Sequence, residues 1–455
     1  MKPIIKIPRG LYEQAKADLL RPHEFAWERV GFFSTLYSKT KSRTIVHCVA
    51  YHPVQDGHYI EDSSVGVRIG PLAITESMAR SLNNSVGQIH IHWHGGSGLP
   101  HPSTTDSNEL PPVQQSLCNA NVNEVHGWMI LGNHDAWVSV FLPGEKAPAV
   151  ECPVTIVGFP TIVNHRDATG HLEKLASGLK KIFKRIKSDG RYHRQSFLGV
   201  KSESIIGKAT VGIIGLGGGG SHIVQQLGHL GFKNFVLCDH DRISKSNLNR
   251  LVGGTLADVK AKRLKVSIAE RGIKKLHGDA AVQSHASRWE DMPESLMRCD
   301  LIIGCVDTFA ARRDLESFCR RHLIPYIDVG MDVHELSAGQ YEIHGQVILS
   351  MPGKPCMHCL GFLNEDVLSK EAEKYGDAGS NPQVVWSNGI LCSAAVGIAV
   401  DVLTDWSKKT RGPVYLGFRG SELSLQPDKR LQHLQTYQCT HYPLSQVGDV
   451  IIKPL

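Results

Sequence analysis

Short apolar runs separated by polar turns fill residues 24–157. Runs of about four to eight residues rich in β-branched and aromatic side chains are typical of strands, whereas apolar residues three or four positions apart are typical of helices. The pattern predicts strands over residues 44–51, 64–69, 88–93, 127–131 and 137–142 and a helix over residues 75–83. These elements together predict a small α+β domain.

A different rhythm begins at Ala209. Continuous apolar runs, typical of strands that are buried on both faces, alternate with helical stretches. The predicted strands cover residues 209–214, 234–238, 301–304 and 325–329, and a helix follows the first of them as far as residue 228. Strands and helices alternating at this spacing favour a parallel, doubly wound sheet. The predicted fold class is therefore α/β, with a Rossmann-like C-terminal sheet and an α+β N-terminal domain.

A stretch rich in Lys and Arg joins the two halves. Residues 171–194 carry leucines and isoleucines about one turn apart, which predicts an amphipathic helix. Its basic face is either a solvated surface or a docking surface. Because a chain of 455 residues suggests two or three domains, we expect an N-terminal domain over residues 1–165, a helical linker over 166–195 and a C-terminal domain over 196–455.

Composition narrows the classes of function. Hydrophobic residues make up 41% of the chain and charged residues 21%, a balance that excludes a fully disordered protein. The net charge of +6 is small for this length, so neither nucleic acid nor a membrane surface is an expected partner. The longest apolar run, residues 390–400, ends at Asp401 and is too short to predict a transmembrane helix. The first residues lack a signal-peptide core, and the 11 cysteines are scattered apart from one C-x-x-C, so we expect a cytoplasmic protein.

A glycine-rich turn after the first C-terminal strand predicts a nucleotide site. Gly215, Gly217 and Gly220 form G-x-G-x-x-G between a predicted strand and a predicted helix. Glycines allow the tight turn and let backbone N–H groups approach phosphate at the positive end of the helix. Asp239 closes the next strand, where a carboxylate can accept a hydrogen bond from a ribose hydroxyl. The glycines alone do not distinguish a dinucleotide from ATP, so an NAD(P)-dependent oxidoreductase is an alternative.

Charged residues beyond the turn favour ATP. They are Asp241, Asn247, Arg250 and Lys262. Arg and Lys close behind the ribose carboxylate suit a triphosphate, because they neutralise its negative charges. Asp307 follows the predicted strand 301–304, at the carboxyl edge where ligands of such sheets bind, and its carboxylate can hold Mg²⁺ against the phosphates.

The second half resembles the ubiquitin-activating adenylyltransferases, especially their MoeB/ThiF branch. The resemblance runs from Arg191 to about Cys439. Its motifs are RYHRQ (191–195), GLGGGG (215–220), LCDHD (237–241), SNLNR (246–250), the Lys262 segment, CVDT (305–308) with Arg312, GQV (345–347) and PCMHCLGF (355–362). The resemblance implies that this domain binds ATP and Mg²⁺, adenylates the C-terminal glycine of a ubiquitin-like or sulfur-carrier protein, and releases pyrophosphate.

The same resemblance implies roles for individual residues. Asp239 would hold the ribose, Arg250 and Lys262 the phosphates, and Asp307 the Mg²⁺. Arg194 would be an arginine finger that reaches into the site of a partner subunit, which implies a homodimer. A conjugating enzyme would be a further partner. Electrostatic groups of this kind are what nucleotidyl transfer needs, since the substrate supplies the nucleophile.

Two cysteine features depart from the family pattern. Many members carry a catalytic cysteine shortly before the helix that here begins near Gly389, but the segment reads NPQVVWSNGILC. Cys392 lies inside an apolar helix, so we expect it to be a core residue and expect adenylation without a thioester step. The family's two cysteine pairs correspond here to Cys356, Cys359, Cys439 and His441. These four side chains predict a Cys₃His zinc site, with a metal-free knuckle as the alternative.

A histidine cluster lies in the first half, in HIHWHGGSGLPHPSTTD (90–106). His92 and His94 alternate with Trp93, so on a strand both would face the same side. With Asp106 they supply three ligands and leave one tetrahedral position for water, as catalytic zinc sites do. His90 shares this face but lies deeper in the strand, and we expect it to be packed.

This cluster resembles the JAB/JAMM metallopeptidases, which remove ubiquitin-like proteins. Their pattern is a glutamate three residues before a glycine, then H-x-H, then S-x-x-D. The matching residues here are Glu28 and Gly31, His92 and His94, and Ser103 and Asp106, with one extra residue before the serine and Gly95 in place of the usual proline. The resemblance implies Zn²⁺ on the two histidines and the aspartate, Glu28 as general base and then acid, and Ser103 as a group that stabilises the oxyanion.

The two resemblances support one another. One domain would cleave after the C-terminal glycine of a small β-grasp protein and the other would activate that glycine, and their fusion makes the second encounter effectively intramolecular. An adenylyltransferase fused to a catalytically inactive JAB docking module is the alternative. The sequence identifies neither the modifier nor its final target, and sulfur transfer and protein conjugation begin with the same acyl adenylate.

Overall fold

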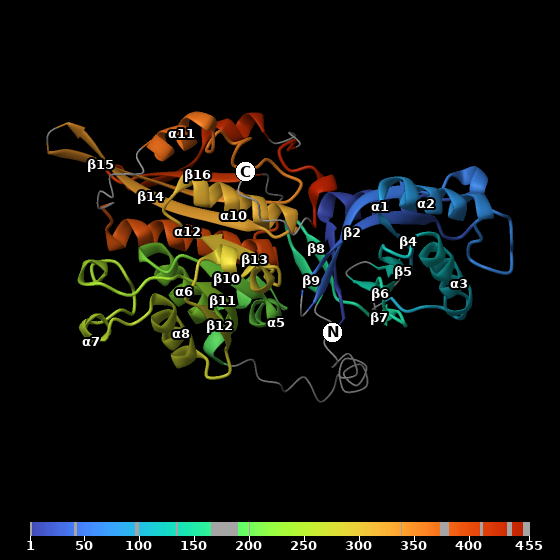
Figure 1. Ribbon diagram of the computed structural model, residues 1–455, viewed down its shortest axis with the longest axis horizontal. Helices are drawn as coiled ribbons and strands as arrows, with labels where there is room; N and C mark the ends of the chain where they lie inside the picture. Colours follow the sequence, from blue (N-terminus) through green and yellow to red (C-terminus); the bar gives the residue numbers. More distant parts are fainter. Residues whose placement is uncertain are drawn as a thin grey trace. The chain divides into compact units, whose positions relative to one another are not determined.

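The computed structural model describes residues 2–40, 43–95, 100–132, 135–164, 190–199, 201–337, 339–373, 382–409, 413–434 and 439–448 (Figure 1). These residues divide into two compact units. The first contains residues 2–157, 161–164 and 444–448, and the second contains residues 158–160 and 190–443, with the gaps just given. Residues 171–189 of the expected linker helix lie outside the described residues.

The first unit is built on a nine-stranded sheet in the order β7-β6-β5-β4-β2-β3-β1-β8-β9. Its strands are β1 (Ile4–Pro8), β2 (Val30–Lys39), β3 (Thr44–Pro53), β4 (Gly87–Trp93), β5 (His126–Leu131), β6 (Ala136–Phe141), β7 (Ala149–Val150), β8 (Val154–Val157) and β9 (Ile162–Asn164). Its helical elements are α1 (Arg9–Leu19), η1 (Asp56–His58), α2 (Pro71–Asn84), α3 (Thr104–Ala120) and η7 (Leu444–Gln446).

Two separate cores cover the two faces of this sheet. Phe33, Ile89 and Ile91 pack with the buried residues of α1 on one face. Val30 and Phe32 belong to a second core that includes residues from α2 and α3. Because successive residues of a strand point to opposite faces, the histidines that alternate with Ile89 and Ile91 on β4 lie on the α2 and α3 side.

Most of the strands expected in this half are present, but the one expected over residues 64–69 is wrong. The described backbone there forms only an isolated bridge between Tyr59 and Ile69. The Asp62 carboxylate accepts hydrogen bonds from the backbone N–H of Ser64 at 2.9 Å and from its hydroxyl at 2.5 Å. This local side-chain bond favours a turn over an extended strand.

The second unit is built on an eight-stranded sheet in the order β12-β11-β10-β13-β14-β15-β16-β17. Its strands are β10 (Thr210–Ile214), β11 (Asn234–Cys238), β12 (Ala281–His285), β13 (Leu301–Gly304), β14 (Tyr326–Ser337), β15 (Gln340–Ser350), β16 (Val414–Arg419) and β17 (Ser424–Pro427). Its α-helices are α5 (Ser202–Lys208), α6 (Gly218–Leu230), α7 (Leu256–Lys260), α8 (Lys265–Leu276), α9 (Pro293–Leu296), α10 (Phe309–Arg321), α11 (Glu365–Glu373) and α12 (Val385–Thr404). Its short 3₁₀ segments are η3 (Gly190–Leu198), η4 (Lys245–Asn247), η5 (Trp289–Asp291) and η6 (Lys429–His433).

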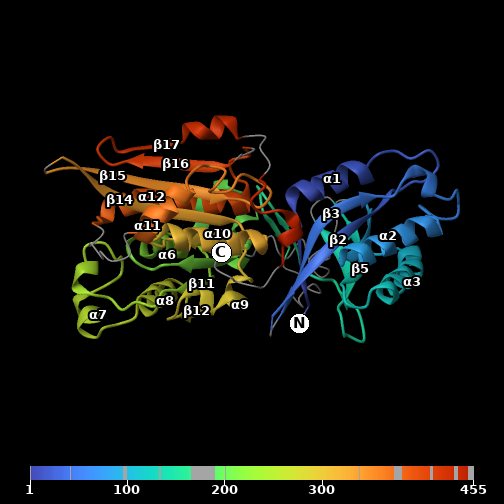
Figure 2. The ribbon, with the colours of Figure 1, turned by 45° about the horizontal axis from the view of Figure 1, so that its top comes forward.

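Half of this sheet is doubly wound, as expected. β10 pairs in parallel with β11 on one side and with β13 on the other, and β12 and β14 extend the parallel part outward. The expectation of a parallel sheet is wrong beyond β14, because β14 to β17 pair antiparallel. Figures 1 and 2 show β14 and β15 continuing past their neighbours as a hairpin. A hairpin turn can join only antiparallel strands, whereas the helical crossovers before β14 produce parallel ones.

The long apolar helix α12 forms part of the core of the second unit. Its length and composition alone would let it cross a membrane, but such helices also occur in the cores of globular units. α12 packs on α6, β14 and β15, and Leu391, Cys392 and Ala395 are fully buried. The expected burial of Cys392 is thus confirmed.

Candidate functional site

The glycine turn links the end of β10 to the start of α6. Gly215 has a φ of +84°, a conformation that favours glycine, and its N–H donates to Cys238 O at 2.9 Å. A Cβ on Gly220 would collide with the backbone carbonyl of Gly215, whereas a Cβ on Gly217 would meet no atom within 4 Å. Gly215 is thus required by conformation and Gly220 by packing. Gly217 instead leaves open space at the positive end of the helix, where a phosphate can approach.

Asp239 is bonded to the glycine turn itself. Its Oδ2 accepts a hydrogen bond from Leu216 N at 2.6 Å and its Oδ1 accepts one from Asp241 N at 2.8 Å. Lys265 Nζ lies 2.7 Å from Asp241 Oδ2 and 3.8 Å from Asp239 Oδ2. Burial alone would raise the pKa of Asp241, but the hydrogen bond and positive charge of Lys265 lower it overall. Asp239 therefore shapes the turn, and its ribose-binding role stays a prediction.

The residues expected to bind phosphate differ in their contacts and in their exposure to solvent. The side chain of Arg250 lies at the amino end of α6, since a Cβ on Gly218 would be 3.2 Å from Arg250 Cδ. Asn247 uses its amide oxygen locally, accepting from Ser244 N at 2.9 Å. Lys262 is exposed, and no hydrogen bond or ion pair engages its ammonium group within the described parts of the chain. Arg250 is therefore adjacent to the glycine turn, and Lys262 is available to an incoming ligand.

Asp307 lies on a short loop that is anchored against the glycine turn. Cys305 N donates to Ile214 O at 2.8 Å, and a Cβ on Gly215 would touch the Cys305 backbone at 2.5 Å. Asp307 is exposed, and among the residues that the structure describes none forms a hydrogen bond or ion pair with its carboxylate. An exposed carboxylate beside a phosphate-type turn suits a Mg²⁺ that also contacts the phosphates.

Two further residues from the sequence analysis differ sharply in their surroundings. Arg194 is exposed on η3, and within the described ranges its guanidinium has no partner. Cys392 is buried, its thiol donates to Gly219 O at 3.2 Å, and burial raises its pKa to about 12. A buried, protonated thiol is a poor nucleophile.

Cys356, Cys359, Cys439 and His441 come together, with their ligand atoms all within 4.8 Å of one another. The Cys356 and Cys359 sulfurs are 3.5 Å apart, and His441 Nδ1 lies 3.6 Å and 3.3 Å from them. Tetrahedral zinc with Zn–S bonds of about 2.3 Å would hold two sulfurs about 3.8 Å apart, so the donor set fits the ion closely. The hydrogen bond between Cys356 and Cys439 lowers the pKa of Cys439 and raises that of Cys356, so the pair favours one thiolate, on Cys439.

Helix α10 holds this cysteine knuckle in place through two buried charged side chains. Glu316 Oε1 accepts from Met357 N, inside the C-x-x-C, at 2.8 Å. The Arg320 guanidinium donates to the carbonyls of Met351, Lys354 and Pro355 at 2.6–2.9 Å. The backbone that carries Cys356 and Cys359 is therefore fixed before a metal binds.

The histidine cluster of the first unit converges with Glu28 because of strand register. Val30 on β2 lies opposite His92 on β4 in an antiparallel pair, so two further residues in each direction bring Glu28 beside His94. His94 Nε2 is 3.9 Å from Glu28 Oε1 and 3.2 Å from His92 Nε2. Glu28, His92 and His94 place their ligand atoms within 4.8 Å of one another.

Asp106 approaches the same histidines from the first turn of α3. Its Oδ1 lies 3.3 Å from His92 Nε2 and its Oδ2 lies 3.4 Å from His94 Nε2. Ligand atoms of a tetrahedral zinc ion with bonds of about 2.0–2.1 Å would lie about 3.3–3.4 Å apart, so this donor set fits zinc. Although burial raises the pKa of Asp106, hydrogen bonds from His92 and Ser103 lower it overall, which favours the carboxylate form.

Ser103 is the N-cap of α3 and forms a capping box with Asp106. Its hydroxyl donates to Asp106 Oδ2 at 2.7 Å and accepts from Asp106 N at 3.1 Å. In this arrangement Ser103 orients the carboxylate, and an oxyanion role would require its hydroxyl to rotate away. His90 is buried against Phe32, and burial lowers its pKa to about 3, as expected of a packed histidine.

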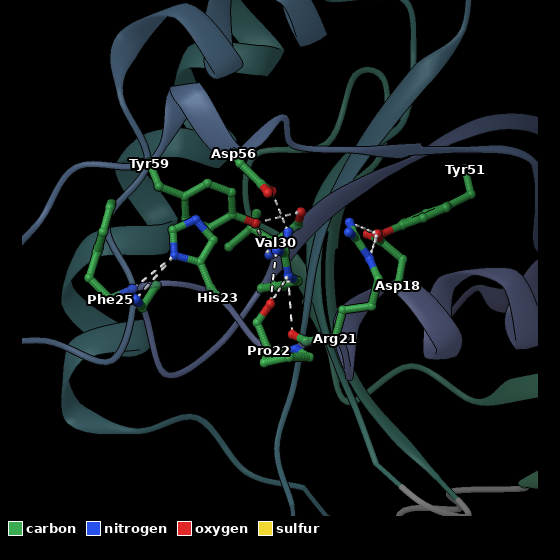
Figure 3. A network of polar contacts seen from close by, with 11 residues as sticks. Asp18, Arg21, Pro22, His23, Phe25, Val30, Tyr51, Asp56 and Tyr59 are labelled. Atoms are coloured by element: carbon green, nitrogen blue, oxygen red, sulfur yellow. Dashed lines mark hydrogen bonds and ion pairs between the residues drawn. The ribbon is translucent and has the colours of Figure 1, made fainter.

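Partly buried hydrogen bonds attach the segment next to Glu28 to Arg21, Pro22 and Asp56 (Figure 3). Its neighbour Arg29 is 3% exposed and contacts the ring of Tyr59. The Arg29 guanidinium donates to Asp56 Oδ1 at 2.6 Å, Arg21 O at 3.1 Å and Pro22 O at 3.0 Å. The backbone that carries Glu28 is therefore attached through Arg29 to residues 21, 22 and 56.

The second unit combines a Rossmann-like sheet that is parallel from β12 to β14, a glycine turn of the kind that can receive phosphate, and a cysteine knuckle. A family model described as "ThiF family" matches residues 191–434, more than half of the 455 residues. The chain therefore belongs to the ThiF family. The expected MoeB/ThiF resemblance of the second half is confirmed, whereas the JAB/JAMM resemblance of the first half stays a prediction.

Curated relatives match parts of the chain. Ubiquitin-like modifier-activating enzyme 5 of Drosophila willistoni is 26% identical over 30% of this chain and 37% of its own length. Molybdopterin-synthase adenylyltransferase of Escherichia coli K12 is 25% identical over 50% of this chain and 86% of its own. Sulfur carrier protein ThiS adenylyltransferase of Bacillus subtilis 168 is 26% identical over 49% of this chain and 61% of its own. The chain thus spans less than two thirds of two of these three relatives.

Two residues near the glycine turn and the Asp307 loop were not predicted from the sequence. Lys265 contacts Asp241, but nothing in its segment distinguishes it from Lys260 or Lys262. Glu371 bonds to the first turn of α10, although 62 positions separate it from Phe309. Neither contact leaves a periodic or spaced pattern in the sequence.

Proposed function

We propose that the second unit adenylates the C-terminal glycine of a ubiquitin-like or sulfur-carrier protein. The observation that carries this proposal is the convergence of the glycine turn, the Arg250 side chain and the Asp307 loop at the carboxyl edge of the parallel sheet. Membership of the ThiF family and the names of the relatives support adenylation as the reaction. The carrier, the homodimer and a conjugating enzyme as partner are parts of the same proposal.

The reaction needs little covalent chemistry from the protein. A carboxylate oxygen of the carrier attacks the α-phosphorus of ATP, the bond to the β-phosphate breaks, and pyrophosphate leaves with the electron pair. Backbone N–H groups at the start of α6, together with Arg250 and Lys262, stabilise the phosphate charge. Mg²⁺, when bound at Asp307, would further neutralise the leaving pyrophosphate. Cys392 is too deeply buried to accept the acyl group, so the product is the acyl adenylate.

Arg194 acts in this proposal on the site of a second copy. It is exposed on η3 and has no partner within the described residues of its own chain. Mixed dimers of Arg194→Ala and Asp307→Ala chains would contain one intact site, and activity in the mixture but in neither variant alone is the expected result. Full activity of Arg194→Ala by itself would contradict the role.

Carrier-dependent exchange of labelled pyrophosphate into ATP tests adenylation. We expect exchange with a candidate carrier, loss of exchange in Asp307→Ala, and normal exchange in the control Asp332→Ala, which changes an exposed aspartate on β14. Full exchange in Asp307→Ala would contradict its Mg²⁺ role. Tight binding of NAD without affinity for ATP would favour an oxidoreductase instead.

We propose that the first unit is a zinc isopeptidase of the JAB/JAMM type, acting on the same carrier. The convergence of His92, His94 and Asp106 beside Glu28 supports it. Zinc, when bound, would supply a water whose pKa falls towards about 7. With zinc bound, the Glu28 carboxylate would act as general base and then as general acid, taking up a proton and passing it on, while Ser103 keeps the Asp106 carboxylate oriented.

Zinc content and cleavage together test this unit. We expect one zinc fewer per chain in His92→Ala, no loss in His101→Ala, and loss of cleavage of a carrier fusion in Glu28→Gln. His101→Ala is a matched control because His94 Nδ1 contacts the backbone carbonyl of His101, which the substitution keeps. Zinc and carrier binding without cleavage would favour the inactive docking module, and absence of zinc would contradict the metal site.

A cytoplasmic location stays a prediction.

A further inference from the structure

The carboxylate of Glu371 spans the first turn of α10. Its Oε1 accepts a hydrogen bond from Phe309 N and its Oε2 accepts one from Ala310 N, both at 2.9 Å. The first N–H groups of any helix have no partner within the helix, and a carboxylate there also interacts favourably with the helix dipole. Glu371 lies on α11, so this contact joins two elements that are far apart in the sequence.

The turn that Glu371 holds begins directly after the Asp307 loop. Thr308 is the N-cap of α10 and accepts from Ala311 N at 3.1 Å. The other end of the loop is fixed where Cys305 N donates to Ile214 O at 2.8 Å. Asp307 therefore lies between two anchors, and Glu371 provides two of the hydrogen bonds of the second anchor.

Helix α11 is also tied to the start of α10 through the segment that precedes it. Before it, Phe362 of the segment that follows the C-x-x-C packs against Phe309, with ring centroids 5.5 Å apart. Glu371 thus makes a polar contact between α11 and the first turn of the helix that follows the Asp307 loop.

We propose that Glu371 is a positioning residue for Asp307: it fixes the first turn of α10 so that the Asp307 carboxylate is presented to the Mg²⁺ that accompanies ATP. This inference rests on the proposed function, since it takes Asp307 as the Mg²⁺ ligand. Glu371 does not contact the metal or the nucleotide. Its effect is to limit the directions in which the Asp307 carboxylate can point, as groups that orient metal ligands do.

Calorimetric titration of ATP into the full chain, with Mg²⁺ and with EDTA, tests the proposal. In Glu371→Ala we expect the Kd for ATP in Mg²⁺ to rise about tenfold, while the Kd in EDTA changes less than about twofold. In Mg²⁺, the Kd of Glu371→Gln should fall between those of the unsubstituted chain and Glu371→Ala. The amide retains one acceptor oxygen but replaces the other acceptor with a donor. Glu365→Ala is the matched control, since Glu365 is an exposed glutamate on the same helix.

The possible outcomes separate this inference from the function on which it rests. If Asp307→Ala weakens ATP binding only in Mg²⁺ and Glu371→Ala does not, the positioning role is wrong and the Mg²⁺ role of Asp307 stands. If Glu371→Ala weakens binding equally in Mg²⁺ and in EDTA, Glu371 has only a general structural role and the inference is overturned. If Asp307→Ala has no Mg²⁺-dependent effect, the proposed role of Asp307 fails first.

Discussion

Replacing Gly220 with alanine should destabilise the second unit and weaken ATP binding together. The added Cβ would lie 2.9 Å from the Gly215 carbonyl carbon and closer still to its oxygen, so α6 or the turn must shift. Overpacking costs about 1–3 kcal/mol, and a clash with backbone atoms falls in the upper part of that range, about 2–3 kcal/mol, of which the better helix propensity of alanine returns about 1 kcal/mol. The expected net loss of about 1–2 kcal/mol corresponds to a fall of about 2–8 °C in the midpoint of thermal unfolding.

Gly217 provides the matched contrast. It precedes α6, and its Cβ would meet nothing within 4 Å. Gly217→Ala should therefore change the unfolding free energy by only about 0.5 kcal/mol, the usual difference between glycine and alanine at an N-cap. Its methyl group would nevertheless stand where phosphate approaches the helix, so the Kd for ATP should rise at least about tenfold.

Calorimetry measures both quantities on the same preparations. Scanning calorimetry gives the unfolding midpoint and titration calorimetry gives the Kd for ATP. Unchanged ATP affinity in Gly217→Ala would refute the phosphate-binding role of the turn. An unchanged unfolding midpoint in Gly220→Ala would refute the packing argument.

Further substitutions test the two units separately. Arg320→Met should lower the unfolding free energy of the second unit by about 3–5 kcal/mol, because it removes the donor of hydrogen bonds to Ser350 Oγ and to the carbonyls of Met351, Lys354 and Pro355, and a loss below about 1 kcal/mol in denaturant titration would contradict this. Cys359→Ser should remove one equivalent of zinc from the chain by metal analysis, and unchanged zinc content would count against the Cys₃His site. Burial, with the nearby charge of Arg80, lowers the pKa of His52 from 6.5 to about 4. The His52 imidazole therefore becomes protonated at a lower pH in the folded first unit than in the unfolded chain. The contribution of His52 to the free energy of unfolding is complete above pH 6.5 and is lost as the pH falls towards about 4. A His52→Gln chain with the same pH dependence of unfolding would contradict this.

Local patterns predicted the parts of the site that depend on local geometry. Alternation along β4 predicted that His92 and His94 share a face, whereas helix α3, which presents Asp106 through a capping box with Ser103, was not predicted. Glu28 came only from the family resemblance, because its approach to His94 depends on the antiparallel register of β2 and β4. Such pairing between distant strands leaves no signal in the periodicity of either strand.

The fold of the second unit shows the same division. The strands and glycine turn around β10 were predicted, since continuous apolar runs and G-x-G-x-x-G are local features. The antiparallel half was not, because apolar periodicity does not specify the direction of the neighbouring strand. The Glu371 contact with α10 was missed for a related reason: one carboxylate among many on a polar helix face has no distinguishing pattern.

The most direct test of the account is to incubate the chain with ATP, Mg²⁺ and a candidate carrier and to analyse the carrier by intact-protein mass spectrometry under mildly acidic quenching. We expect the carrier to gain one AMP group at its C-terminal glycine, with pyrophosphate as the other product. An unmodified carrier, or ATP split to ADP and phosphate, would contradict it.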